Sequence, residues 1–80
     1  MISIVGAGSL GRRVLYMLCS DPGYWKSEYR FYDDAPALAE QSVLGVPVVG
    51  TFDDLANSEP STVIVAIGDR ILFKIGRWYF

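Results

Sequence analysis

Three glycines near the start of the chain constrain its fold more than any other feature of the sequence. They stand at Gly6, Gly8 and Gly11 in the segment IVGAGSLGRR, with the spacing G-x-G-x-x-G. A β-branched apolar run precedes them and an amphipathic helical pattern follows, so the sequence predicts a strand, a tight turn and a helix in immediate succession. Such a unit is typical of α/β folds, in which strands alternate with helices.

Each glycine of this spacing meets a different steric demand. The first allows the tight turn, the second lets a pyrophosphate approach the backbone, and the third lets the helix pack closely on the strand. The N–H groups at the helix start, at the positive end of the helix dipole, attract phosphate. The alternative is that the glycines only make the turn and that both arginines after it are solvated. The predicted phosphate-binding residues are Gly6, Ala7, Gly8, Ser9, Gly11 and Arg12.

Further strands and helices are expected along the chain. The predicted strands are Met1 to Val5, Tyr29 to Tyr32, Gly45 to Gly50 and Thr62 to Ile67, with a strand start at Arg77 to Phe80. The predicted helices are Ser9 to Ser20, Phe52 to Asn57 capped by Thr51, and Arg70 to Gly76 capped by Asp69, with one helical turn inside the loop Ala35 to Leu44. This alternation predicts a small Rossmann-like three-layer α/β domain with a parallel sheet, and 80 residues are enough for one domain, residues 1–80.

Acidic residues follow two of the predicted strands. Asp33 and Asp34 end one strand, and Gly68 and Asp69 end another. In open parallel sheets ligands lie beyond the carboxyl ends of the strands, and Asp33 follows the glycine motif at about the 20-residue distance at which an acid contacts a ribose. Neighbouring residues on a strand point to opposite faces, so Asp33 and Asp34 are not expected to converge as a general acid and base. A solvated strand end, and for Asp69 a plain helix cap, are the structural alternatives.

Composition excludes several classes of function. The net charge of −2 disfavours nucleic-acid binding, and the longest apolar runs are far shorter than the roughly 20 residues that span a bilayer. The chain has no histidine, so the commonest general base is missing and no metal site or catalytic residue is predicted.

Its single cysteine, Cys19, cannot form an internal disulfide and is expected to pack in the core. We expect a cytoplasmic protein, and the aromatic tail at Trp78 to Phe80 makes homo-oligomerisation plausible.

Four segments, read together, resemble a known family. They are IVGAGSLGR, FYDDAP, VLGVPVVGTFDDL and VIVAIGD, and they cover nearly all of the chain from Ile4 to Asp69. In this order the segments resemble the N-terminal domain, of the PglD and NeuD type, of bacterial sugar acetyltransferases whose catalytic domain is a left-handed β-helix. The family acts on sialic acid and on nucleotide-linked amino sugars in surface-polysaccharide biosynthesis.

The resemblance implies a domain that binds the nucleotide part of a nucleotide-sugar. The glycine loop would face the phosphates, and Asp33 with Asp34 would face the ribose and base. Acetyl-CoA is implied for the complete enzyme and is bound outside this domain, so no cofactor is expected in this chain and the chain is expected to be incomplete as a catalyst. Two alternatives stay open: a Rossmann module of an oxidoreductase or redox sensor that binds NAD or CoA, and a non-catalytic interaction domain.

Overall fold

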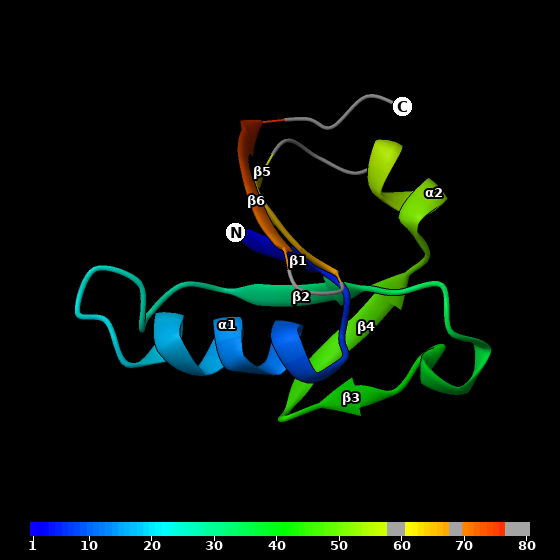
Figure 1. The fold of residues 1–80 in the computed structure, drawn as a ribbon, viewed down its shortest axis with the longest axis horizontal. Helices are drawn as coiled ribbons and strands as arrows, with labels where there is room; N and C mark the ends of the chain where they lie inside the picture. Colours follow the sequence, from blue (N-terminus) through cyan, green and yellow to red (C-terminus); the bar gives the residue numbers. More distant parts are fainter. Residues whose placement is uncertain (58–60, 68–69, 77–80) are drawn as a thin grey trace.

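The computed structural model describes residues 1–57, 61–67 and 70–76. Six strands of this part form one sheet in the order β3-β4-β2-β1-β5-β6 (Figure 1). The strands are β1 (Ile2–Val5), β2 (Tyr29–Tyr32), β3 (Ser42–Val43), β4 (Val46–Gly50), β5 (Ser61–Ile67) and β6 (Arg70–Gly76). The helices are α1 (Ser9–Cys19), a 3-10 turn η1 (Pro36–Leu38) and α2 (Phe52–Ala56). The predicted α/β fold class is confirmed.

The centre of the sheet is parallel, as the sequence predicts. β1 pairs in parallel with β2 on one side and with β5 on the other, and β2 pairs in parallel with β4. The carboxyl ends of these four strands therefore lie along one edge of the sheet. The pairing of β2 with β4 shifts in register between Phe31 and Tyr32.

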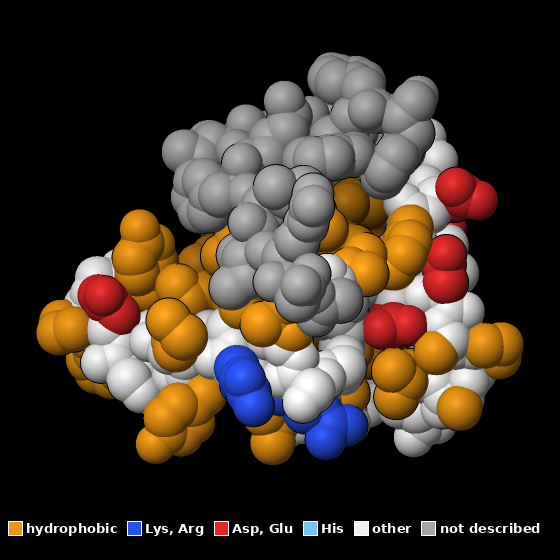
Figure 2. Space-filling model, in the orientation of Figure 1, with side chains coloured by type: hydrophobic (Ala, Val, Ile, Leu, Met, Phe, Trp, Pro, Cys, Tyr) orange, Lys and Arg blue, Asp and Glu red, His pale blue; other side chains and the backbone are white. Residues whose placement is uncertain are grey.

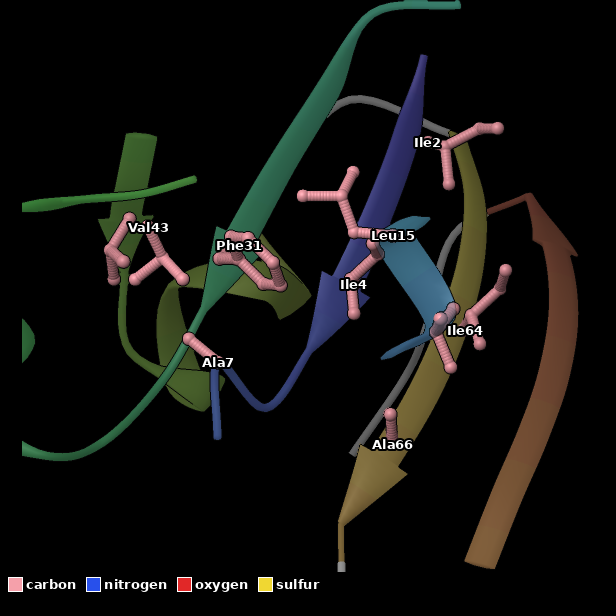
Figure 3. Close-up of a cluster of buried hydrophobic side chains, with 10 residues drawn as sticks. Ile2, Ile4, Ala7, Leu15, Phe31, Val43, Ile64 and Ala66 are labelled. Carbon is pink, nitrogen blue, oxygen red and sulfur yellow. The ribbon is translucent and has the colours of Figure 1, made fainter. Parts of the chain in front are cut away.

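Helices cover both faces of the sheet. On one face, Val14 and Leu15 of α1 pack with Ile4, Phe31 and Ile64, and Figure 3 shows these strand side chains gathered beside the helix. The opposite face carries a smaller cluster, in which Leu55 of α2 packs against one buried residue from each of three parallel strands. These strand residues are Val5, Tyr32 and Val63. Because successive side chains of a strand point to opposite faces of the sheet, the strands contribute to two separate hydrophobic cores. The sheet between its two helical layers gives the predicted three layers.

The segment between β2 and α2 holds more structure than the sequence predicts. The predicted helical turn is present as η1, but Ser42–Val43 forms a short antiparallel strand beside β4. The hairpin turn between β3 and β4 has Leu44 and Gly45 at positive φ, a conformation that glycine adopts freely and leucine rarely does. The extended segment predicted from Gly45 to Gly50 is confirmed as β4, with proline as its second residue.

The helix predicted from Arg70 to Gly76 is wrong. These residues form β6, which pairs antiparallel with the whole of β5 from Ile67↔Arg70 to Ser61↔Gly76. Only two positions, with the sequence Gly-Asp, separate the two paired runs, and this is a hairpin signal that the capping interpretation of Asp69 overlooked. The sheet therefore has antiparallel strands at both edges. The strand start predicted at Arg77 to Phe80 lies outside the described residues.

Cys19 does not pack in the core as predicted. It is the last residue of α1 and its side chain is exposed. The buried stripe of the helix runs through Gly11, Val14 and Leu15, with Leu18 partly buried at its end. In the described part of the chain, no helix is long and apolar enough to cross a membrane.

Candidate phosphate-binding site

Two of the three motif glycines are required by the packing of the chain. Gly6 has φ +102°, and a Cβ atom there would overlap the carbonyl oxygen of Ala66 on β5. A Cβ atom on Gly11 would overlap the carbonyl oxygen of Gly6, because the first turn of α1 lies directly on the end of β1. These are the tight turn and the close helix packing that the motif predicts.

Gly8 is different, because nothing lies within 4 Å of the Cβ position that a larger residue would occupy. It is exposed, and its φ of −81° is an ordinary value for any residue. The packing of the domain therefore does not require glycine here. Open space at this backbone position is what a closely approaching ligand needs.

The N-terminus of α1 is open. Gly8 is its N-cap, no side chain caps the helix, and the first turn holds no acidic residue. The first N–H groups of an α-helix have no acceptor within the helix, and the helix dipole makes this end electropositive. Arg12 and Arg13 are the fourth and fifth residues of α1 and are exposed. In Figure 2 the basic side chains of this face lie near the start of α1, whereas acidic side chains line the side of α2. This helix end is therefore suited to an anion.

A cleft of about 300 Å³ lies in front of this helix end. Its walls come from the glycine loop, the end of β2, the start of α2 and the end of β5. The residues that line it are Gly6, Gly8, Ser9, Leu10, Asp33, Phe52, Ala66 and Ile67. The cleft is therefore at the carboxyl edge of the parallel strands, where ligands of open α/β sheets bind.

The two aspartates after β2 hold backbone groups of other segments. Asp33 Oδ2 accepts a hydrogen bond from the Ala7 N–H at 2.8 Å, and Oδ1 accepts one from the Ala35 N–H at 2.8 Å. Asp34 Oδ1 accepts a hydrogen bond from the N–H of Phe52, the first residue of α2, at 2.9 Å. The two carboxylates bind different segments and do not converge on one atom.

A second cleft, of about 430 Å³, shares Asp33 with the first. It is lined by residues 33–36 after β2, by Ala39 and Glu40, by the end of β4 and by Thr51 and Asp54. The two clefts adjoin at Asp33, with the first in front of the open end of α1 and the second beside the loop around η1. Within the described part of the chain, no group of three or more Asp, Glu, His or Cys residues could hold a metal ion.

A comparison with protein families shows the family of this chain. The model of the PglD N-terminal domain family matches residues 1–72. The chain belongs to the PglD N-terminal domain family. The match covers the glycine loop, both aspartates and every parallel strand of the sheet. A search of curated proteins and a search of solved structures each found no match.

The PglD N-terminal domain brings most of the predicted site residues to one place. Gly6, Gly8, Ser9 and Asp33 line the first cleft, Asp34 lines the second, and Ala7 is joined to Asp33. Gly11 is buried beneath the loop, and Arg12 lies on an exposed patch with Tyr16 and Met17. Gly68 and Asp69 lie outside the described residues.

Four residues that the sequence interpretation did not select also line the first cleft of the PglD N-terminal domain. They are Leu10, Phe52, Ala66 and Ile67. Leu10 and the two β5 residues could have been found, since they flank the predicted loop and strand end. Phe52 could not, because its position in the cleft depends on the hydrogen bond between its N–H and Asp34.

Proposed function

We propose that this domain binds the nucleotide part of a nucleotide-linked amino sugar as the N-terminal domain of a bacterial sugar acetyltransferase. The observation that carries the proposal is the uncapped N-terminus of α1, which opens into the first cleft beside Gly8. In the proposal the diphosphate lies against the first-turn N–H groups of α1, and the ribose and base extend into the second cleft. Membership of the PglD N-terminal domain family supports this substrate class.

The chemistry assigned to the domain is positioning. Binding of the nucleotide would hold the sugar near an acetyl donor, and such placement makes the transfer effectively intramolecular. Acetyl-CoA would be bound by another domain of the enzyme, and the residues of the two clefts would take no part in acyl transfer. Sialic acid and amino sugars of surface polysaccharides are the acceptors that the family suggests.

The steric freedom at Gly8 gives the proposal a direct test. Uridine diphosphate is titrated into the ¹⁵N-labelled protein, and the wild type is compared with Gly8→Ala. The added methyl group meets no protein atom within 4 Å, so the fold is kept, but it occupies the space through which phosphate approaches the backbone. We expect the affinity for uridine diphosphate to fall at least about tenfold, which corresponds to ~1.4 kcal/mol.

Gly23→Ala serves as the matched control, because Gly23 lies in the loop after α1 and its Cβ would meet only the exposed Asp21 side chain, at 3.2 Å. This variant should bind like the wild type. Unchanged affinity in Gly8→Ala would contradict the placement of the diphosphate. Absence of wild-type binding at millimolar uridine diphosphate would contradict the proposed function.

One observation favours a second candidate, the non-catalytic interaction domain. The Ala7 N–H of the glycine loop is already bound by the domain's own Asp33. A domain that has lost its ligand would be expected to fill its loop in this way. The same titration distinguishes the two, since an interaction domain would respond to neither uridine diphosphate nor NAD, and a response to NAD alone would favour a dinucleotide module.

A further inference from the structure

Three separate segments of the candidate site meet at the aspartate pair after β2. Asp33 is hydrogen-bonded to Ala7 of the glycine loop, 26 positions away along the chain. Asp34 is hydrogen-bonded to Phe52 at the start of α2, 18 positions away. The second oxygen of Asp33 binds Ala35, which holds the carboxylate to its own loop. The pair therefore joins the glycine loop, the loop after β2 and α2.

The Asp33 carboxylate is held from two sides. Each of its oxygens accepts one backbone N–H at 2.8 Å, a distance typical of hydrogen bonds to a charged group. Ala7 is fully buried and directly precedes Gly8, the N-cap of α1. Because the peptide unit is planar, fixing the Ala7 N–H restricts how the chain enters the first turn of α1. Asp33 thereby fixes the peptide unit from which the chain enters the first turn of α1.

Asp34 acts on the opposite wall of the same cleft. Its bond to the Phe52 N–H fixes the first residue of α2, and the Phe52 side chain lines the cleft and packs against the cluster of Val5, Tyr32, Leu55 and Val63. The two neighbouring carboxylates thus hold the two walls of the cleft at a fixed separation.

We propose that Asp33 and Asp34 are positioning residues that shape the anion site, and that Asp33 does not bind the ribose diol. The inference rests on the proposed function and deepens it. A carboxylate that binds a diol orients an oxygen lone pair toward each hydroxyl, whereas the Asp33 carboxylate is oriented by the backbone N–H that each of its oxygens accepts, and this bond occupies one of the two lone pairs of that oxygen. The dipoles of these two N–H groups partly offset the negative charge of the carboxylate, which reduces its repulsion of a bound phosphate.

Three ligands separate the two roles of Asp33. Binding of uridine diphosphate, its 2′,3′-dideoxy analogue and inorganic pyrophosphate is measured by calorimetry for the wild type and for Asp33→Asn, whose side chain can accept only one of the two N–H bonds. A positioning residue acts through the backbone N–H groups of α1, and these would bind the two linked phosphates that all three ligands contain. We expect Asp33→Asn to weaken all three by the same factor, about tenfold, and to leave the ratio between diol and dideoxy ligands unchanged.

If Asp33→Asn lost affinity for uridine diphosphate alone, the inference would be overturned, because uridine diphosphate is the one ligand of the three that has a ribose diol. Equal or tighter binding of all three ligands by Asp33→Asn would overturn it too. Asp53→Asn is the matched control, since Asp53 is an exposed acid in the first turn of α2, for which the described contacts include no hydrogen bond of its side chain. It removes the same charge and should leave all three affinities unchanged.

A measurement without ligand separates this inference from the proposed function. Hydrogen exchange of the Ala7 amide should accelerate at least about tenfold in Asp33→Asn, and that of the Phe52 amide in Asp34→Asn, while the Ile4 amide in β1 keeps its rate and reports that the sheet is intact. If the wild type fails to bind uridine diphosphate but these amides accelerate, the proposed function is wrong and the positioning role stands. Unchanged exchange at Ala7 in Asp33→Asn would overturn the positioning role itself.

Discussion

Gly11 lies so close to Gly6 that a Cβ atom on Gly11 would overlap the Gly6 carbonyl oxygen. Both partners in this contact are backbone, so no side-chain movement can relieve it. We expect Gly11→Ala to destabilise the domain by about 2–3 kcal/mol, in the upper part of the range for overpacked cores, and to lower the melting temperature by roughly 10–20 °C. Thermal unfolding followed by circular dichroism measures this effect.

Gly8→Ala is the comparison for that experiment, since it adds the same methyl group in open space. Its expected cost is at most about 1 kcal/mol, from the weaker N-cap preference of alanine. Equal melting temperatures of the two variants would show that α1 does not pack on β1 as described.

A capping box begins α2. Asp54 Oδ2 accepts hydrogen bonds from the Thr51 N–H at 2.8 Å and from the Thr51 hydroxyl at 3.2 Å. We expect Asp54→Ala to reduce the free energy of unfolding in urea by about 1 kcal/mol. Asp53→Ala, at the preceding position, removes an equal charge without a cap and should cost less than about 0.5 kcal/mol. If the Asp53 variant costs as much as the Asp54 variant, the effect comes from charge alone.

The exposed position of Cys19 predicts a reactive thiol in the native protein. An aromatic disulfide reagent should modify one thiol per chain without denaturant, because access does not require unfolding. The far-ultraviolet circular dichroism should be unchanged after modification. A thiol that reacts only in denaturant would indicate that the sequence-based prediction of a core cysteine was correct after all.

Tyr29 gives the domain a sensitivity to alkaline pH. Burial raises the pKa of Tyr29 above its ordinary value of about 10, and the neighbouring Cys19 adds to the rise. Its hydroxyl also donates a hydrogen bond to the Tyr24 carbonyl oxygen at 2.6 Å, which requires the protonated form. Because the folded pKa lies above the unfolded one, this stabilisation is complete below the unfolded pKa and is lost as pH rises through the folded pKa.

Tyr29→Phe should therefore lose less stability than the wild type between about pH 9 and pH 11, as measured by urea unfolding at each pH. The other tyrosines and the lysines are common to both proteins and cancel in the comparison. Parallel pH profiles for the two proteins would contradict the raised pKa.

Local signals in the sequence are sufficient for the parallel half of the fold. The spacing of the glycines predicts the turn at Gly6 and the close packing at Gly11, and the β-branched runs predict β1 and β5. Thr51 predicts the start of α2, because a capping residue acts only on the turn that follows it. These features depend on sterics and hydrogen bonds between near neighbours in the chain.

The C-terminal strand was predicted wrongly because two local signals compete there. Asp69 is a good helix cap, and Gly68 with Asp69 is also a good hairpin turn. The conflict is decided by β5, whose free edge offers a full row of backbone partners to residues 70–76. The sequence of residues 70–76 alone cannot predict that the edge of β5 is available for pairing.

Local patterns in the sequence are enough to place the strand–glycine–helix unit, the parallel core and the acidic pair after β2. The contacts of that pair depend on the fold. Ala7 and Phe52 lie far from Asp33 and Asp34 along the chain, and their N–H groups reach these carboxylates because the parallel strands end at one edge of the sheet. A carboxylate cannot reveal from its own sequence neighbours whether a ligand or a distant backbone amide will bind it, since that choice depends on which segments the fold brings within hydrogen-bond distance.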